Sequence, residues 1–189
     1  MENDQLKEII KRCIADDRTA QEQLFKHFYG KMMGVCLRYT KDRDRAQEVV
    51  QESFIKIFDK LDEFDFKGSF EGWVRRIMVN ASIDAIRKRN RQPFSTDEEY
   101  VFNDSYSVQE HDLDDDITKI KAEYALEAIQ QLSPAYQTVF NLCVIENYSH
   151  KEIAQILDIS EGTSKSNLAK AKQNLRKILS EKFVNIEDQ

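Results

Sequence analysis

Apolar residues return at every third or fourth position through two long blocks of this chain, and a segment without that period separates them. The first block runs from Gln5 to Arg91, and the second runs from Ile117 to about Phe183. Such spacing places apolar side chains on one face of a helix. Five glycines and two prolines in 189 residues leave few points at which a helix would break. We therefore predict an all-α fold of two small helical domains, residues 1–92 and 117–189.

The intervening segment, residues 93–116, carries nine acidic side chains and neither lysine nor arginine. Like charges repel one another and extend a chain that has little apolar surface to bury. We predict an acidic, flexible linker here. Two interpretations stay open: a solvated spacer, or a polyanion that imitates nucleic acid in a basic channel.

The net charge of −6 hides two basic regions on either side of this linker. Residues 67–92 hold seven basic and two acidic side chains, and residues 162–182 hold six basic and one acidic, so each region has a net charge of +5. Local positive charge is what attracts phosphates. The acidic total therefore does not exclude a nucleic-acid partner.

Capping signals in the second block predict a helix-turn-helix. Ser133 and Pro134 are typical of a helix start, and we expect that helix to reach about Glu146. Ser149 and Glu152 have capping-box spacing and open a short helix, and Ser160 caps a long one after a tight turn. Two helices joined in this way form a helix-turn-helix.

The long helix has an apolar side and a side rich in serine, threonine, lysine and asparagine near its start. Those residues donate to phosphates and base edges, and the start of a helix favours anions. The alternative is an ordinary solvated helix face. The polar side and its flanks include Thr163, Lys165, Ser166 and Lys170.

The helix predicted from Ala46 to Leu61 shows an apolar residue within an acidic, polar face. That arrangement suggests a protein-docking surface, although a lone exposed isoleucine is common and can mean nothing. The residues of this face are Glu48, Gln51, Glu52, Ile55 and Asp59.

The helix predicted from Phe70 to Arg89 is apolar almost all round, apart from one narrow polar stripe. Aromatic residues stand beside cations at its start and in the preceding loop, and rings that stack on bases beside cations that hold phosphates are typical of single-stranded nucleic-acid sites. Aromatic residues in a small helical domain can equally belong to its core. The stripe consists of Arg76, Asn80, Asp84 and Arg87, and the neighbouring residues are Phe66, Lys67, Phe70 and Trp73.

Other features argue against an enzyme, a metal site or a membrane protein. His27, His111 and His150 are widely separated, no glycine-rich phosphate loop occurs, and the acidic cluster lies in the predicted linker. The three cysteines are far apart, so we expect buried thiols in a reducing cytoplasm. The acidic amino terminus is not typical of a signal peptide, and no apolar run approaches the roughly 20 residues of a membrane span. We expect no cofactor and no metal.

Three segments together resemble the extracytoplasmic-function (ECF) sigma factors of bacterial RNA polymerase, and the resemblance covers almost the whole chain. RDRAQEVVQESFIKIFDKL is similar to the core-polymerase-binding region of that family. FDFKGSFEGWVRRIMVNASIDAIRKRNR is similar to its promoter-melting helix and loop. LSPAYQTVFNLCVIENYSHKEIAQILDISEGTSKSNLAKAKQNLRKIL is similar to its second conserved domain.

The resemblance implies that the chain joins core polymerase, at the clamp coiled coil and the flap, and directs it to promoter DNA. The face around Ile55 would bind the clamp, and the linker would thread toward the RNA-exit channel. An anti-sigma factor is a further implied partner. The proximal promoter element would be captured and melted without ATP by Phe66, Lys67, Phe70, Trp73, Arg76, Asn80, Arg87 and Lys88.

The long helix of the second block would then read the distal promoter element in the major groove. The resemblance implies Thr163, Lys165, Ser166, Asn167 and Lys170 as its DNA-contacting residues. This chain departs from the family near that helix start. Family members often have a branched apolar residue in place of Ser164, and arginine in place of Lys165 and Lys170. A helix-turn-helix repressor or activator that works without polymerase is the main alternative, but it gives no reason for the polar stripe on residues 70–89.

Overall fold

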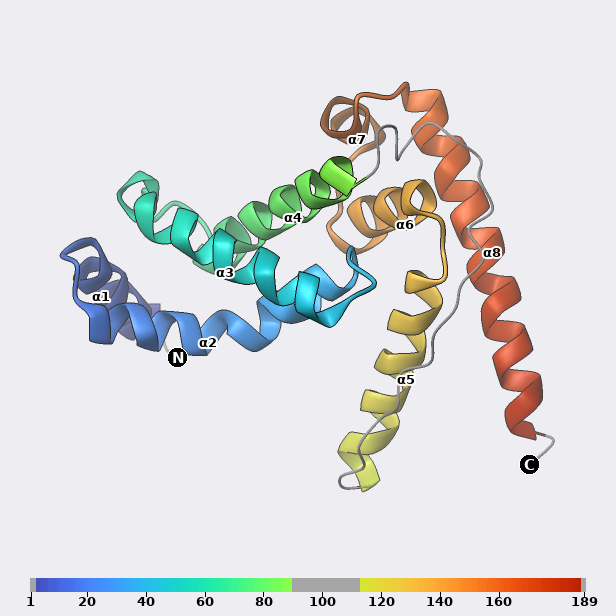
Figure 1. Cartoon of the computed structure of the whole chain (residues 1–189), viewed down its shortest axis with the longest axis horizontal. Helices are drawn as coiled ribbons and strands as arrows, with labels where there is room; N and C mark the ends of the chain where they lie inside the picture. Colours follow the sequence, from blue (N-terminus) through green and yellow to red (C-terminus); the bar gives the residue numbers. More distant parts are fainter. Residues whose placement is uncertain (1–2, 90–112, 188–189) are drawn as a thin grey trace. The chain divides into compact units, whose positions relative to one another are not determined.

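The computed structural model describes residues 3–89 and 113–187, and it is helical in both parts (Figure 1). The described residues contain helices and turns but no strand, which confirms the predicted all-α class. The chain divides into two compact units, Met1–Arg89 and Asn90–Gln189. Each unit has its own core.

In its described residues, the first unit contains four α-helices and one short 3₁₀ helix. They are α1 (Asn3–Ile14), α2 (Arg18–Leu37), α3 (Arg43–Asp59), η1 (Leu61–Glu63) and α4 (Phe70–Arg89). The second helix packs against the other three α-helices. Its buried residues return at three and four positions, as the apolar period predicts; they are Ala20, Leu24, Phe28, Met32, Met33, Val35 and Cys36.

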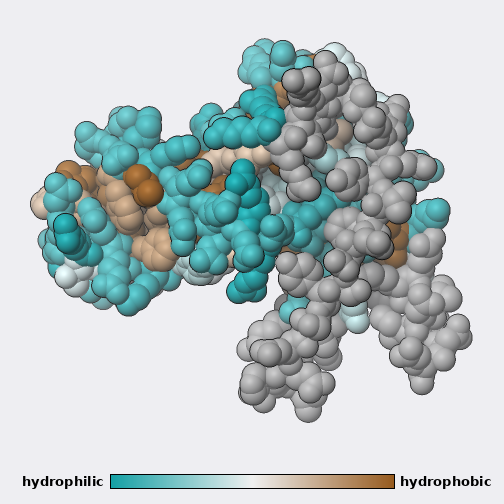
Figure 2. All heavy atoms as spheres, viewed as in Figure 1, coloured by the Kyte–Doolittle hydropathy of each residue, from teal (hydrophilic) through white to brown (hydrophobic). Residues whose placement is uncertain are grey.

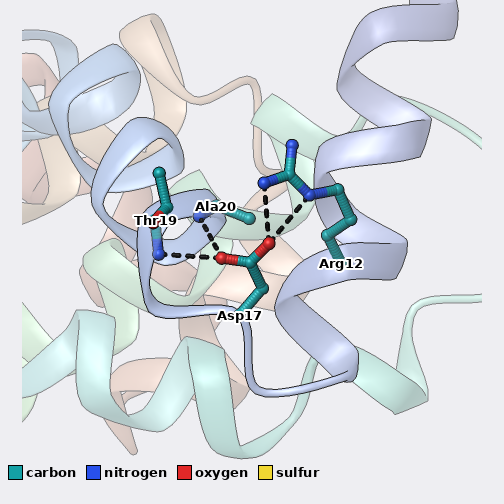
Figure 3. Close-up of polar contacts among 4 residues, drawn as sticks. All are labelled: Arg12, Asp17, Thr19 and Ala20. Atoms are coloured by element: carbon teal, nitrogen blue, oxygen red, sulfur yellow. Dashed lines mark hydrogen bonds and ion pairs between the residues drawn. The ribbon is translucent and has the colours of Figure 1, made fainter.

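Asp17 fixes the corner between α1 and α2 (Figure 3). One carboxylate oxygen accepts the backbone N–H groups of Thr19 and Ala20 at 2.9 and 3.2 Å, which caps α2. The other oxygen accepts hydrogen bonds from Nε and Nη2 of Arg12 at 2.9 and 2.6 Å. These bonds, that with Arg12 first, hold the pKa of Asp17 below its ordinary value. The corner therefore fastens α1 to α2.

The second unit contains α5 (Leu113–Gln130), α6 (Pro134–Phe140), η2 (Asn141–Ile145), α7 (His150–Leu157) and α8 (Glu161–Glu187). Helix α8 packs against α5, α6 and α7. A core of small and branched residues joins α5, α6 and α8, which lets the helices approach closely. Its buried members are Ala128, Ile129, Leu132, Ala171 and Leu175.

Two helix boundaries in this unit differ from the prediction. Helix α5 begins at Leu113, before the predicted Ile117, and takes in Asp114, Asp115 and Asp116. Acidic residue types are favoured near the start of a helix, because the amino-terminal end of a helix is positive. The helix that starts at Pro134 is α-helical only to Phe140 and continues as a π-helix to Ile145. The rest of the predicted linker, residues 93–112, lies outside the described residues.

Candidate nucleic-acid and protein interfaces

One face of α3 is buried and the other is exposed along its whole length. Ala46, Val50 and Ile57 are fully buried against the unit's core. The predicted docking residues Glu48, Gln51, Glu52, Ile55 and Asp59 are all exposed. Ile55 has 63% of its surface exposed, the largest fraction among the exposed large hydrophobic residues of the described chain. Hydrophilic residues cover much of the visible surface of this unit, with small hydrophobic patches between them (Figure 2).

The polar stripe of α4 faces solvent, and most other described residues of the helix are buried or half-buried. Val74, Met78, Val79 and Ile83 are buried. Arg76, Asn80, Asp84, Arg87 and Lys88 are exposed. Nη1 of Arg87 lies 3.5 Å from a carboxylate oxygen of Asp84 within the stripe. A helix buried on its other sides thus presents one line of hydrogen-bonding and cationic groups.

A constrained turn precedes α4. Asp65 accepts the backbone N–H of Lys67 at 2.9 Å, and its other oxygen lies 3.2 Å from the Lys67 ammonium. Both bonds lower the pKa of Asp65. Phe66 has a φ of 60° and Gly68 a φ of 108°. A bulky residue with positive φ is rare, whereas glycine adopts such angles readily. The turn therefore holds Phe66 in a strained conformation.

Four aromatic rings join this turn to α4. Phe64 contacts all three other rings, with centroid distances of 5.1 Å to Phe66, 5.1 Å to Phe70 and 5.6 Å to Trp73. Phe70 is only 4% exposed, so it faces the core and supports the cluster from behind. Phe66 is 37% exposed and Trp73 is half-buried, so both keep ring surface at the protein's exterior. The core and surface interpretations of these aromatics therefore each hold for part of the cluster.

The start of α8 presents some of the predicted DNA-contacting residues and buries one. Lys165 and Ser166 are exposed, and Thr163 is half-buried. Ser160 caps the helix, because its hydroxyl accepts the backbone N–H of Thr163 at 2.9 Å. Asn167 is only 6% exposed and lies on the core side with Ala171 and Leu175. Asn167 therefore faces the interior of its unit and not the solvent.

The fifth predicted residue, Lys170, lies at the edge of the exposed face. Its ammonium is 5.8 Å from the centre of the Tyr136 ring, which belongs to α6. Its side chain is half-buried, whereas Lys165 and Lys172 are exposed. Sequence reasoning identified Lys170 but not Tyr136, because no spacing within α8 shows which ring of another helix lies beneath it.

Side-chain hydrogen bonds hold the helix-turn-helix together. The predicted capping box is present at α7: the backbone N–H of Ser149 donates to Glu152 at 2.8 Å, and that of Glu152 donates to the Ser149 hydroxyl at 3.3 Å. Asp158 ends α7 with a left-handed φ of 56°. Nδ1 of His150, the first residue of α7, lies 2.8 Å from the buried Ser164 hydroxyl of α8.

Three further features of the described residues concern metal binding, membrane spanning and the cysteines. Within residues 3–89 and 113–187, no group of histidine, cysteine, aspartate or glutamate is arranged to hold a metal ion. No helix in the same ranges has the length and apolarity to cross a membrane. The three cysteines are free; Cys13 and Cys36 are buried and Cys143 is half-buried.

Comparison with known proteins identifies two regions of this chain. Residues 24–92 match the family described as Sigma-70 region 2, and residues 122–175 match Sigma-70, region 4. The ECF RNA polymerase sigma factor SigW of Bacillus subtilis is 30% identical over 181 residues, which cover 92% of this chain and 96% of that protein. The RNA polymerase sigma-H factor of Pseudomonas aeruginosa is 26% identical over 93% of this chain and 94% of its own length.

A solved structure shares the fold. The sigma factor RpoE of Bartonella quintana, in a co-crystal structure with the anti-sigma factor NepR, aligns with a TM-score of 0.53 and 23% identity over 84% of this chain and 96% of its own. Region 4 of Sigma-70 is a DNA-binding helix-turn-helix, and sigma factors are transcription initiation factors rather than enzymes. From its two matched regions and its relatives of nearly equal length, this chain belongs to the extracytoplasmic-function sigma factors of bacterial RNA polymerase.

Proposed function

We propose that this chain binds core RNA polymerase, directs it to the promoters of a specific regulon and melts those promoters. The observation that carries the proposal is the exposed polar stripe of α4, on a helix whose other sides are buried or half-buried. A repressor that binds only duplex DNA needs no such stripe. A factor that captures a separated strand needs both cations and accessible rings beside it.

Polymerase docking is assigned to the exposed face of α3. Ile55 supplies apolar area at its centre, while Glu48, Gln51, Glu52 and Asp59 surround it with polar and acidic groups. An apolar anchor within a polar rim is the common anatomy of a protein interface. The partner surface is the clamp coiled coil, and the flap is the second contact of the polymerase.

Proximal promoter capture is assigned to the turn around Phe66 and Lys67 together with the stripe on α4. An unstacked base would lie against the accessible ring surface of Phe66 and of half-buried Trp73. The strand would be held by Arg76, Asn80, Arg87 and Lys88. Unpairing a base costs a few kcal/mol. Stacking returns about 1–3 kcal/mol per base, so capture can offset melting without ATP. Phe70 contributes by supporting the cluster.

Distal promoter recognition is assigned to the start of α8. Lys165 and Ser166 are exposed and would face the DNA, while half-buried Thr163 and Lys170 lie on one flank. Asn167 is buried and acts by keeping the helix seated on its unit. A recognition helix inserts its first turns into the major groove, which fits the position of these residues.

Domain organisation and further partners complete the proposal. Residues 1–92 form the domain that binds polymerase and melts the promoter, residues 93–116 the acidic linker to the RNA-exit channel, and residues 117–189 the distal-element domain. The chain acts in the cytoplasm, where polymerase works. The Bartonella quintana relative is solved in complex with an anti-sigma factor, and we propose a partner of that class here.

The deciding experiment is transcription in vitro with purified core polymerase on genomic DNA of the source organism, with and without this chain. New transcript starts that share two spaced upstream motifs are the expected result. Duplex binding without any new start would overturn the proposal in favour of a repressor, provided that core enzyme of the same organism transcribes with its primary sigma factor in a parallel reaction.

A further inference from the structure

Lys170 is held differently from the other lysines at the start of α8. Lys165 and Lys172 extend from the helix into solvent, whereas Lys170 is half-buried with its ammonium 5.8 Å from the ring centre of Tyr136. That distance is within the range of a cation–π contact, in which the negative ring face attracts the cation. The contact links the recognition helix to α6.

The Tyr136 ring is itself fixed in place. Tyr136 stands in the first turn of α6, after Pro134, and packs against the core formed by Ala128, Ile129, Leu132, Ala171 and Leu175. A lysine stem is flexible and loses rotamer freedom when a ligand immobilises it. A ring fixed by the core restricts the stem before DNA arrives, so less freedom is lost on binding.

The direction of the held side chain matters for DNA. Ser164, Ala171 and Leu175 define the buried side of α8, and Ser166 and Ala169 lie opposite it. At 100° per residue, Lys170 falls between those two sides, on the flank next to α6. An unsupported lysine on that flank could extend in several directions, and the contact with the Tyr136 ring limits those choices.

We propose that Tyr136 is a positioning residue for distal promoter binding, which it supports by holding the Lys170 ammonium at the edge of the recognition surface. The inference rests on the proposed function, since it needs α8 to contact DNA. Tyr136 touches no base or phosphate in this scheme. It acts through Lys170.

A double-mutant cycle on the full-length chain tests this, with the holoenzyme titrated onto duplexes that carry the distal motif recovered from transcript-start mapping. We expect Tyr136→Leu, which keeps apolar bulk without a π face, to weaken binding about two- to fivefold, the fold-change that corresponds to an exposed cation–π contact. Tyr136→Phe keeps the ring and should bind like the parent chain. In a Lys170→Ala background, Tyr136→Leu should have no further effect.

Three outcomes would contradict the inference, and each leads to a different conclusion. If Tyr136→Leu weakened DNA binding equally in the parent chain and in the Lys170→Ala background, Tyr136 would only stabilise the unit. If Lys170→Ala left DNA binding unchanged, Lys170 would not belong to the recognition surface, and Tyr136 would have no positioning role there. The lack of any shared distal motif would overturn the proposed function itself. Thermal melts of each variant separate loss of folding from loss of contact.

Discussion

Nδ1 of His150 lies 2.8 Å from the hydroxyl of Ser164, and this hydrogen bond joins the first residue of α7 to the buried side of α8. Both residues belong to the helix-turn-helix, so the bond fixes the rotation of the recognition helix against its neighbour. Ser164 is fully buried, so this hydrogen bond is a polar contact within the packing of the two helices.

Removing the Ser164 hydroxyl should therefore destabilise the second unit. We expect Ser164→Ala to lower the free energy of unfolding by about 1 kcal/mol, because one hydrogen bond is lost and half-buried His150 can regain a water partner. Urea unfolding followed by circular dichroism measures the change. Ser166→Ala, on the exposed side of the same helix, is the matched control and should change stability much less. Equal effects of the two substitutions would rule out a structural role for the bond.

The exposed face of α3 predicts a defect in binding that leaves folding intact. Gln51→Ala combined with Ile55→Asp should weaken core-polymerase binding at least about fivefold, since an apolar anchor of an interface is typically worth more than about 1 kcal/mol. Neither side chain is buried in the free chain, so the melting temperature should stay near that of the parent. Co-purification with core polymerase checks the affinity. Lys56→Gln, also exposed on α3, serves as control, and an unchanged pull-down for the double variant would place docking elsewhere.

The turn before α4 predicts a defect in promoter melting. Asp65→Ala removes both bonds to Lys67 and should slow strand opening, because nothing then offsets the cost of the positive φ at Phe66. Asp65→Asn keeps an acceptor for the Lys67 N–H and should retain much of the activity. Permanganate reactivity of unpaired thymines measures the opening.

A premelted template provides the control for that experiment. It bypasses strand separation, so Asp65→Ala should regain most of its activity there if only melting is impaired. Persistent loss on the premelted template, together with reduced polymerase binding, would show that the turn serves docking rather than melting. Gly68→Ala should resemble Asp65→Ala, because alanine is strained at the φ of 108° found there.

Burial of Cys36 predicts slow thiol chemistry and a stability that depends on pH. Desolvation raises the pKa of Cys36 to about 11, as it does that of Cys13. The thiolate is the nucleophile, so alkylation by iodoacetamide at pH 8 should be far slower in the folded chain than in urea. The unfolded chain loses these thiol protons from about pH 9, while the folded chain keeps them until about pH 11. Stability should therefore fall as pH rises above about 9.

Mass spectrometry of peptides that contain each cysteine measures the alkylation, and urea unfolding at pH 8 and pH 10 measures the stability change. Cys36→Ala should show a shallower decline over that pH interval. Equal alkylation of Cys36 in the folded and unfolded chains would contradict its burial.

The sequence alone determined the helical class and the family, because both follow from local patterns. The apolar period sets which face of each helix is buried, and the Ser149–Glu152 capping box starts α7 through bonds between residues three positions apart. The polar stripe of α4 could likewise be recognised from spacing, and its residues are exposed as that spacing requires. Helix boundaries were less certain: α5 begins before its predicted start, and the π-helical end of α6 left no signal in the apolar period.

Only the tertiary structure decided which of the candidate residues can meet a partner. Phe70 and Asn167 belong to promising local patterns, yet both are buried, because the packing of neighbouring helices covers one edge of each pattern. The contacts of Lys170 with Tyr136 and of Ser164 with His150 join residues 34 and 14 positions apart. A helical period describes one helix at a time, so it carries no information about the side chain that the next helix brings beside it.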